Sequence, residues 1–305
     1  MNIFSSYADI PQSAQNSVVV IGNFDGVHRG HVALLEKARE ISKQLNSSVS
    51  VLTFEPHPRK LFRPDDPPFR ITPPRLKAER LETVGVESLF SIGFDWDFAS
   101  QSADKFIEDI LLNGIKPAHV VVGYDFRFGQ LRAGTPDTIN AAGIPVSVVE
   151  EIMDQSSAKI SSSEVRQALR HGQIKEANAL LGWNWQIWGE VVKGDQRGRE
   201  LGYPTANFKL QETVHPAYGV YAARVQIEGE HEWRGAAINI GIKPMFEVPL
   251  AEVESHIFDF DRDIYGKTIK IEPVQFLRGE AKFDSIDELI EQMDKDCQQA
   301  REILE

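Results

Sequence analysis

The sequence predicts two folds in one chain: an α/β domain with a parallel sheet, then a small β-barrel followed by a C-terminal helix. Residues 18 to about 182 alternate strand-like and helix-like segments, which is typical of a parallel sheet with crossover helices. After residue 183, short strand-like segments bounded by Gly, Pro and Asp dominate, which indicates a closed or partly closed barrel. A chain of 305 residues is long enough for two domains, which we place at 1–182 and 183–305.

The first element of the α/β domain reads strand, glycine loop and helix. Residues 18–21 are a β-branched run with strand character, and Gly22 and Gly26 follow where a tight turn is needed. From Gly30 onward, apolar residues recur at the spacing of one helix face: Leu34, Ala38, Ile41 and Leu45. Such a loop points backbone N–H groups and the positive end of a helix dipole outward, and phosphate is their usual ligand.

The remaining elements follow from the same periodicities. Further strands are predicted in the first domain at 48–54, 89–94, 119–124 and 145–150, with helices near 73–84 and 102–113. Five prolines exclude regular structure from residues 63–75, which we expect to form a surface loop or a lid over the site. Strands of the barrel are predicted at 187–192, 218–229, 233–241, 252–261 and 268–279.

A helix is predicted at the C-terminal end of the barrel domain. Its apolar face contains Ile286, Leu289, Ile290, Met293, Cys297, Ala300 and Leu304. Ser285 and Glu288 have the spacing of a capping box at its start. We therefore assign Cys297 to a packed helix face rather than to a reactive site.

Composition narrows the possible ligands and the compartment. A formal net charge of −12 argues against sequence-independent binding of nucleic acid or anionic lipid, which needs clustered Lys and Arg. This net charge is still compatible with a small anionic ligand that a few local cations hold. The single cysteine excludes a disulfide within the chain and a thiolate zinc site. Since no leader-like pattern and no run of about 18 apolar residues is present, we expect a soluble cytoplasmic protein with no membrane partner.

Two histidines in the glycine loop are the first candidate ligands. His28 or His31 alone would more often be structural or solvated. Together, three residues apart at the mouth of a helix after an apolar strand, they are better explained as anion ligands. The loop is neither a Walker A motif nor the dinucleotide fingerprint G-x-G-x-x-G, so imidazoles must contact the phosphates here.

Five motifs carry a resemblance to a known family. The segment "GNFDGVHRGH" (22–31) resembles the histidine signature of the nucleotidyltransferase superfamily. The segments "TFEPHP" (53–58), "GYDFRFG" (123–129) and "KISSSEVR" (159–166) resemble other signatures of bacterial FAD synthetases. "GRELGYPTANF" (198–208) resembles the riboflavin kinase signature. Because the motifs occur in order over nearly the whole chain, the sequence is identified as a member of the bacterial bifunctional riboflavin kinase/FAD synthetase family.

The resemblance implies an activity for each domain. A barrel of riboflavin kinase type would phosphorylate riboflavin to FMN. A Rossmann-like nucleotidyltransferase domain would adenylylate FMN to FAD and release pyrophosphate. The implied partners are riboflavin, FMN, FAD and ATP, with ATP as co-substrate and Mg²⁺ as cofactor. No nucleic acid partner is expected, and the oligomeric state stays open.

Site residues follow by matching this sequence to the motifs. The implied catalytic groups are His28, His31 and Arg166 for adenylyl transfer and Glu254 for the kinase. Further ATP or phosphate contacts are implied at Gly22, Asn23, Phe24, Asp25, Gly30, Asp125, Ser161, Ser162, Ser163, Lys193 and Arg197. Flavin contacts are implied at His57, Pro58, Phe62 and Phe128, and metal ligation at Thr205 and Asn207.

Several of these residues also have plainer explanations. Ser161 and Glu164 have capping-box spacing, which places Arg166 early in a helix, where it either binds phosphate or is a surface arginine. Asp125 follows a buried strand, so it either holds a ribose, an adenine amino group or a magnesium-bound water, or only forms a turn. His57 lies between two prolines, which suits a rigid site wall or a plain turn.

The barrel residues combine into one magnesium-dependent site. Thr205 and Asn207 are two residues apart, so they lie on one face of an extended chain, where their oxygens could complete a magnesium shell. Glu254 matches the family's general base, whereas the plain alternative is an exposed strand glutamate. Two other functions remain open: the barrel could be a flavin-binding regulatory module, or the first domain could transfer another nucleotide, such as cytidylyl.

Overall fold

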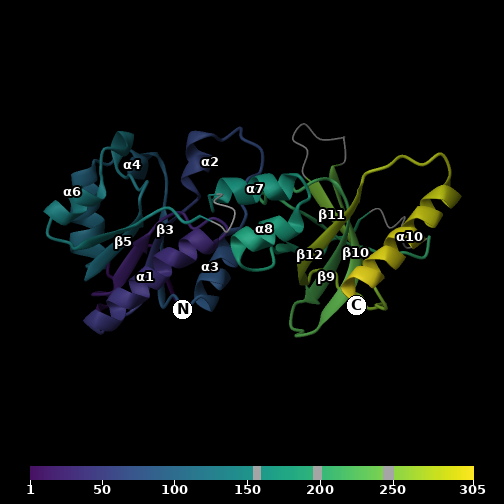
Figure 1. Cartoon of the computed structure of the whole chain (residues 1–305), viewed down its shortest axis with the longest axis horizontal. Coiled ribbons are helices and arrows are strands. Elements are labelled where there is room, and N and C mark those ends of the chain that lie inside the picture. The colour runs from purple at the N-terminus through teal and green to yellow at the C-terminus, as the bar shows by residue number, and fades with distance from the viewer. Residues whose placement is uncertain (154–158, 195–200, 243–250) are drawn as a thin grey trace. The chain divides into compact units, whose positions relative to one another are not determined.

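The computed structural model describes residues 1–153, 159–194, 201–242 and 251–305 (Figure 1). Its internal contacts divide the chain into two compact units. The first unit comprises residues 1–66 and 72–161, and the second, which we call the barrel unit, comprises residues 67–71 and 162–305. Residues 162–182 thus group with the barrel unit, and the functional boundary at 182/183 stays a prediction.

The first unit is built on a parallel six-stranded sheet, as predicted. Its strands are β1 (Asn2–Phe4), β2 (Val18–Ile21), β3 (Val49–Glu55), β4 (Ser88–Gly93), β5 (His119–Gly123) and β6 (Val146–Val149). They lie in the order β1-β4-β3-β2-β5-β6, and every pairing is parallel. The order reverses at β2, which has β3 on one side and β5 on the other. Ligands of such sheets bind at the carboxyl ends of the strands beside this reversal.

Helices cover both faces of this sheet. They are α1 (Arg29–Leu45), α2 (Pro58–Phe62), α3 (Pro74–Thr83), α4 (Trp96–Ala99), α5 (Ala103–Lys105), η2 (Phe106–Ile115) and α6 (Pro136–Ala141), with short 3₁₀ turns η1 (Gln12–Ala14) and η3 (Gln130–Arg132). Leu35 of α1 and Leu81 of α3 pack in one core with Val18, and Ile110 of η2 packs on the other face with Val19. The predicted helix near 102–113 is therefore present, but most of it has π-type hydrogen bonding.

The barrel unit contains an antiparallel six-stranded sheet. Its strands are β7 (Ile187–Glu190), β8 (Ala206–Lys209), β9 (Gly219–Ile227), β10 (Trp233–Ile242), β11 (Ala251–Ile257) and β12 (Thr268–Gly279), in the order β7-β12-β9-β10-β11-β8. After β7, the Val192 N–H donates to the Asn207 carbonyl of β8 at 2.8 Å. This bond joins the two edge strands, so the predicted, partly closed barrel is confirmed.

In its described residues, the barrel unit also contains the helices α7 (Ser162–Arg170), α8 (Ile174–Leu181) and α10 (Ile286–Leu304). In α10, the Ser285 hydroxyl accepts from the Glu288 N–H at 3.2 Å, which is half of the predicted capping box. The Glu288 carboxylate accepts from the Asp284 N–H instead, one residue before the cap. The predicted apolar face packs on the barrel through Ala300, whereas Ile286 in the first turn is 64% exposed.

Residues 69–72 of the proline-rich segment are buried rather than part of a surface loop. The Arg70 N–H donates to the Glu212 carbonyl at 3.1 Å, and the Arg70 carbonyl accepts from the Val214 N–H at 2.8 Å. The indole N–H of the fully buried Trp185 donates to the Ile71 carbonyl at 3.1 Å. Residues 67–71 therefore form part of the barrel unit, because their backbone groups find partners there.

Candidate active sites

The two predicted histidines lie together at the carboxyl end of β2. His28 is the N-cap of α1, and its Nδ1 accepts from the His31 N–H at 3.4 Å. The two rings are stacked, with centroids 3.7 Å apart. Because Nδ1 of His28 is an acceptor, the neutral His28 ring carries its proton on Nε2. The pair thus combines a helix N-terminus with an imidazole donor, and both suit an anion.

The His31 ring has a buried nitrogen that a bound small molecule could contact. Its ring packs against the buried Phe24 ring at 4.8 Å. Its Nδ1 is buried and finds no hydrogen-bond partner among the residues described. Burial, then the His28 ring and the Lys77 ammonium, hold the pKa of His31 well below its usual value. A neutral ring with an unsatisfied buried nitrogen is suited to hydrogen bonding with a phosphate.

The loop before the histidines is fixed by residues from elsewhere in the first unit. The Asp25 carboxylate, 2% exposed, accepts from the Thr72 N–H at 3.0 Å, and the Gly26 N–H donates to the Thr72 hydroxyl at 2.8 Å. At Gly30, an added Cβ would lie 3.0 Å from the His28 ring, so a larger residue would press on that ring. Asp25 is therefore an anchor of the loop, and its direct contact with ATP stays a prediction.

The remaining predicted ligand residues of the first unit lie in the loops and at the helix start that follow its strands. Gly22 and Asn23 begin the loop, and Asp125 is exposed just after β5, at the same carboxyl edge of the sheet. His57 caps α2, since its Nδ1 accepts from the Arg59 N–H at 3.1 Å, and Pro58 is the first residue of that helix.

The two predicted flavin-contacting phenylalanines differ in burial. Phe62 is 55% exposed and makes edge contacts with Phe94 and Trp96, with centroids 5.9 and 5.7 Å apart. Phe128 is only 8% exposed and stacks on Phe126 in the core. The exposed Trp96 was missed by the sequence reasoning, although three aromatic residues within residues 94–98 were a usable signal.

The serine-rich motif lies at the start of α7. Ser161 precedes this helix, and Ser162 and Ser163 are its first residues. Arg166 is 8% exposed, its Nε donates to the Phe69 carbonyl at 2.7 Å, and its guanidinium lies over the Phe69 ring. Arg166 is thus not a surface arginine, and its phosphate contact stays a prediction.

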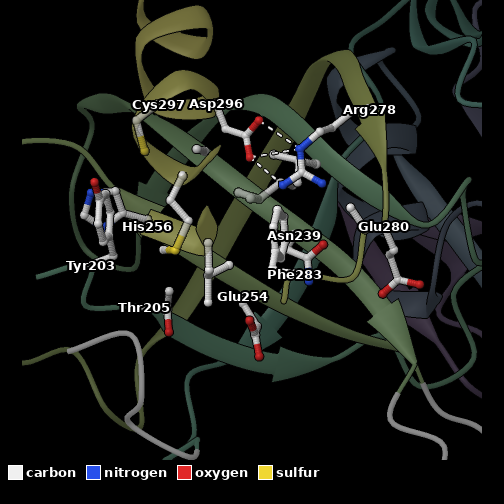
Figure 2. Close-up of a pocket in the computed structure, with 16 residues that line it drawn as sticks. Tyr203, Thr205, Asn239, Glu254, His256, Arg278, Glu280, Phe283, Asp296 and Cys297 are labelled. Atoms are coloured by element: carbon white, nitrogen blue, oxygen red, sulfur yellow. Dashed lines mark hydrogen bonds and ion pairs between the residues drawn. The ribbon is translucent and has the colours of Figure 1, made fainter. Parts of the chain in front are cut away.

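The barrel unit contains a cavity of about 280 Å³ with a polar end and an apolar wall (Figure 2). In Figure 2, Thr205 and Glu254 both lie at the lower edge of the lining side chains, which is the polar end. The apolar wall includes Val220, Ala237, Ile238, Ala281, Phe283, Leu289 and Met293. Such a cavity has room for a flat organic molecule whose polar end reaches Glu254.

Of the predicted kinase residues, Thr205 and Glu254 line this polar end, and Asn207 lies beside Thr205. The Thr205 hydroxyl and the Asn207 amide oxygen are 3.5 Å apart, within reach of one cation. Glu254 pairs in register with Asn207 on one side and with Asn239 on the other. Lys193 is exposed near the Tyr265 ring, at 6.0 Å. The predicted contact Arg197 lies outside the described residues.

The opposite end of the cavity holds groups that the sequence reasoning did not select. Arg278 binds the Asp296 carboxylate through Nε at 3.0 Å and Nη2 at 2.7 Å, and the Tyr203 hydroxyl donates to Asp294. Cys297 is half-buried on α10, and burial together with Asp296 and Asp294 raises its pKa to about 11. The thiol is therefore protonated near neutral pH, in keeping with a packing role.

Comparisons with known proteins agree with this division of sites. A model of the FAD synthetase family matches residues 10–164, and a model of the riboflavin kinase family matches residues 181–304. A bifunctional riboflavin kinase/FMN adenylyltransferase from Bacillus subtilis is 39% identical over 95% of this chain and 93% of its own length. The enzyme of the same name from Escherichia coli K12 is 38% identical over 99% and 97%.

A solved structure covers the chain equally well. A Streptococcus pneumoniae crystal structure, titled as a macrolide-efflux protein, has a TM-score of 0.87 and 34% identity over 98% of both chains. Among the residues that the structure describes, no helix combines the length and apolar character needed to cross a bilayer. Because both family models and the near full-length relatives agree, the chain belongs to the bifunctional riboflavin kinase/FMN adenylyltransferase family.

Proposed function

We propose that the histidine loop, residues 22–31, is the adenylyltransferase site of this enzyme and that the polar end of the barrel cavity is its kinase site. The enzyme phosphorylates riboflavin to FMN and adenylylates FMN to FAD, as its family membership establishes. The observation that carries the assignment is the stacked His28–His31 pair at the N-terminus of α1, beside the reversal of strand order at β2.

In adenylyl transfer, an FMN phosphate oxygen attacks the α-phosphorus of ATP and pyrophosphate leaves. Charge builds on the phosphate oxygens while the bond to the leaving group breaks. The Nε2–H of His28, a nitrogen of His31 and the first N–H groups of α1 would donate to these oxygens. The histidines act as fixed donors and not as nucleophiles, because their neighbours hold them in place before substrate arrives.

In the kinase step, the oxygen of the ribityl 5′-hydroxyl attacks the γ-phosphorus of ATP, Glu254 would accept the proton of this hydroxyl, and ADP leaves. Thr205 and Asn207 would hold a divalent cation, which we propose is Mg²⁺, since hydroxyl and amide oxygens with phosphate suit this ion. When bound, the cation neutralises charge on the ATP phosphates. The apolar wall would hold the isoalloxazine ring, which leaves the ribityl chain near Glu254.

Two single variants of the full chain test both assignments. His31→Ala should lower FAD formation from FMN by about 10² or more, because one preorganised donor is lost, and leave FMN formation unchanged. Glu254→Gln should lower FMN formation by about 10² to 10⁴ and leave FAD formation unchanged. Both rates are measured on each folded protein by chromatographic separation of the flavins. If a variant loses both activities, or if it loses no activity, the corresponding site is assigned wrongly.

A further inference from the structure

A buried lysine lies directly behind the histidine loop, and the proposed mechanism does not use it. The Lys77 side chain on α3 is 1% exposed. Its ammonium forms an ion pair with Glu55 at 2.6 Å and donates to the Thr53 hydroxyl at 3.0 Å. It also donates to the backbone carbonyl of Asn23 at 3.3 Å. Lys77 thus connects the end of β3 to the second residue of the loop.

A second hydrogen bond also holds the Asn23 carbonyl. The Thr53 hydroxyl, itself fully buried, donates to the Asn23 carbonyl at 3.1 Å while it accepts from Lys77. Five residues before Lys77, Thr72 holds Asp25 and Gly26. Residues 72–77 therefore hold the loop on both sides of Phe24.

The loop requires such anchors because its backbone is strained. Phe24 and Val27 have φ values of 52° and 41°, in the left-handed region that bulky and β-branched residues avoid. Conformations of this kind persist only where the surrounding structure fixes them. The loop leads directly into His28, so a shift of Asn23 would move the imidazole pair.

The charge of Lys77 does not explain its position. Its partner Glu55 compensates the ammonium, and only 1% of the side chain is exposed. A buried ion pair is weak evidence for stability, because apolar replacement of both partners is often neutral or stabilising. What an apolar pair could not supply is the hydrogen bond to the Asn23 carbonyl.

We propose that Lys77 is a positioning residue for FAD formation, acting with Thr53 on the Asn23 carbonyl to hold the histidine loop in its reactive geometry. This inference rests on the proposed assignment of the histidine loop to adenylyl transfer. A misplacement of about 1 Å costs roughly 10² in rate, which sets the expected effect.

The main test compares Lys77→Met with the double variant Lys77→Met/Glu55→Gln. The single variant removes the ammonium that faces the Glu55 carboxylate, so a loss of stability is expected there. The double variant removes that charge and should recover the thermal midpoint. Its kcat for FAD formation should nevertheless stay about 10²-fold low, with a smaller change in the KM for ATP. FMN formation on the same protein should be normal, and Lys37→Met, at an exposed ion pair of α1, should change neither rate.

A milder variant keeps the test decisive if the lysine variants fold poorly. Thr53→Val preserves shape and charge but removes the hydroxyl between Lys77 and Asn23, so FAD formation should fall about tenfold. Recovery of both stability and FAD formation in the double variant would overturn the proposal, as would a normal rate for Thr53→Val.

A parallel measurement on His31→Ala separates the role of Lys77 from the assignment of the histidine loop. If it alone retains FAD formation, the loop assignment fails. If it is inactive while the Lys77 and Thr53 variants are normal, only the role of Lys77 fails.

Discussion

At the scale of single residues, His31 links the stability of the first unit to pH. Its pKa is held well below the usual value by burial, His28 and Lys77, so the folded state keeps the ring neutral where the unfolded chain protonates it. The unfolded state then binds more protons below about pH 6.5. This contribution to stability is fully present above the unfolded pKa and is lost as the pH falls.

The pH dependence is measured against a variant that cannot titrate. Between pH 7 and pH 5.5, a histidine that stays neutral when folded costs up to about 1.3 kcal/mol of stability. His31→Gln keeps a polar side chain but has no such proton, so its unfolding free energy should fall less over this range. Denaturant unfolding at the two pH values gives both slopes. Equal slopes in the two proteins would show that His31 is not held neutral by the fold.

Residue patterns revealed the histidine pair but not its supports. His28 and His31 are three positions apart at a helix start, and their interaction is local, so spacing alone predicted it. Lys77 and Thr72 act on loop residues 54 and 47 positions away. Only the fold brings these groups together. A lysine within an amphipathic helix gives no local sign that its ammonium is buried.

At the scale of elements, the start of α10 contributes to the cavity of the barrel unit, which we propose as the kinase site. The Ser285 hydroxyl caps the helix, and Leu289, one turn later, lies in the cavity wall. Ser285→Ala should destabilise the barrel unit by about 1 kcal/mol and raise the KM for riboflavin, because the first turn frays. FAD formation from FMN should not change, and Ser285→Thr, which keeps the cap, serves as the control. Thermal unfolding and kinase kinetics measure these effects, and a wild-type KM in Ser285→Ala would contradict the link.

Element prediction succeeded where apolar runs are continuous and failed where burial depends on distant partners. Strands β2 to β6 coincide with short runs rich in apolar residues, so their positions were predicted to within two residues. The three-residue β1 has mostly exposed side chains and no apolar run to reveal it. Residues 69–72 were expected at the surface because prolines exclude regular structure, but missing periodicity says nothing about burial.

At the scale of the whole molecule, the barrel unit is not continuous in sequence. The barrel could be predicted after residue 183 because all six strands and α10 follow that position. The contribution of residues 67–71 could not, since it depends on hydrogen bonds across more than a hundred positions, as in the bond from the Trp185 indole to the Ile71 carbonyl. The chain therefore enters the barrel unit twice.

A fragment of residues 184–305 tests this discontinuity. It retains every strand of the barrel, Thr205, Asn207 and Glu254, so it should fold and phosphorylate riboflavin at 25 °C. It lacks residues 67–71 and the helices α7 and α8, and with them the partners of Trp185 and of the backbone at 212–214; each lost hydrogen bond costs about 1 kcal/mol. The temperature at which kinase activity is lost should therefore lie roughly 5–15 °C below that of the full chain. Equal temperatures would show that these two missing parts of the barrel unit contribute nothing to its stability, whereas an insoluble fragment would show that the barrel requires at least one of them to fold.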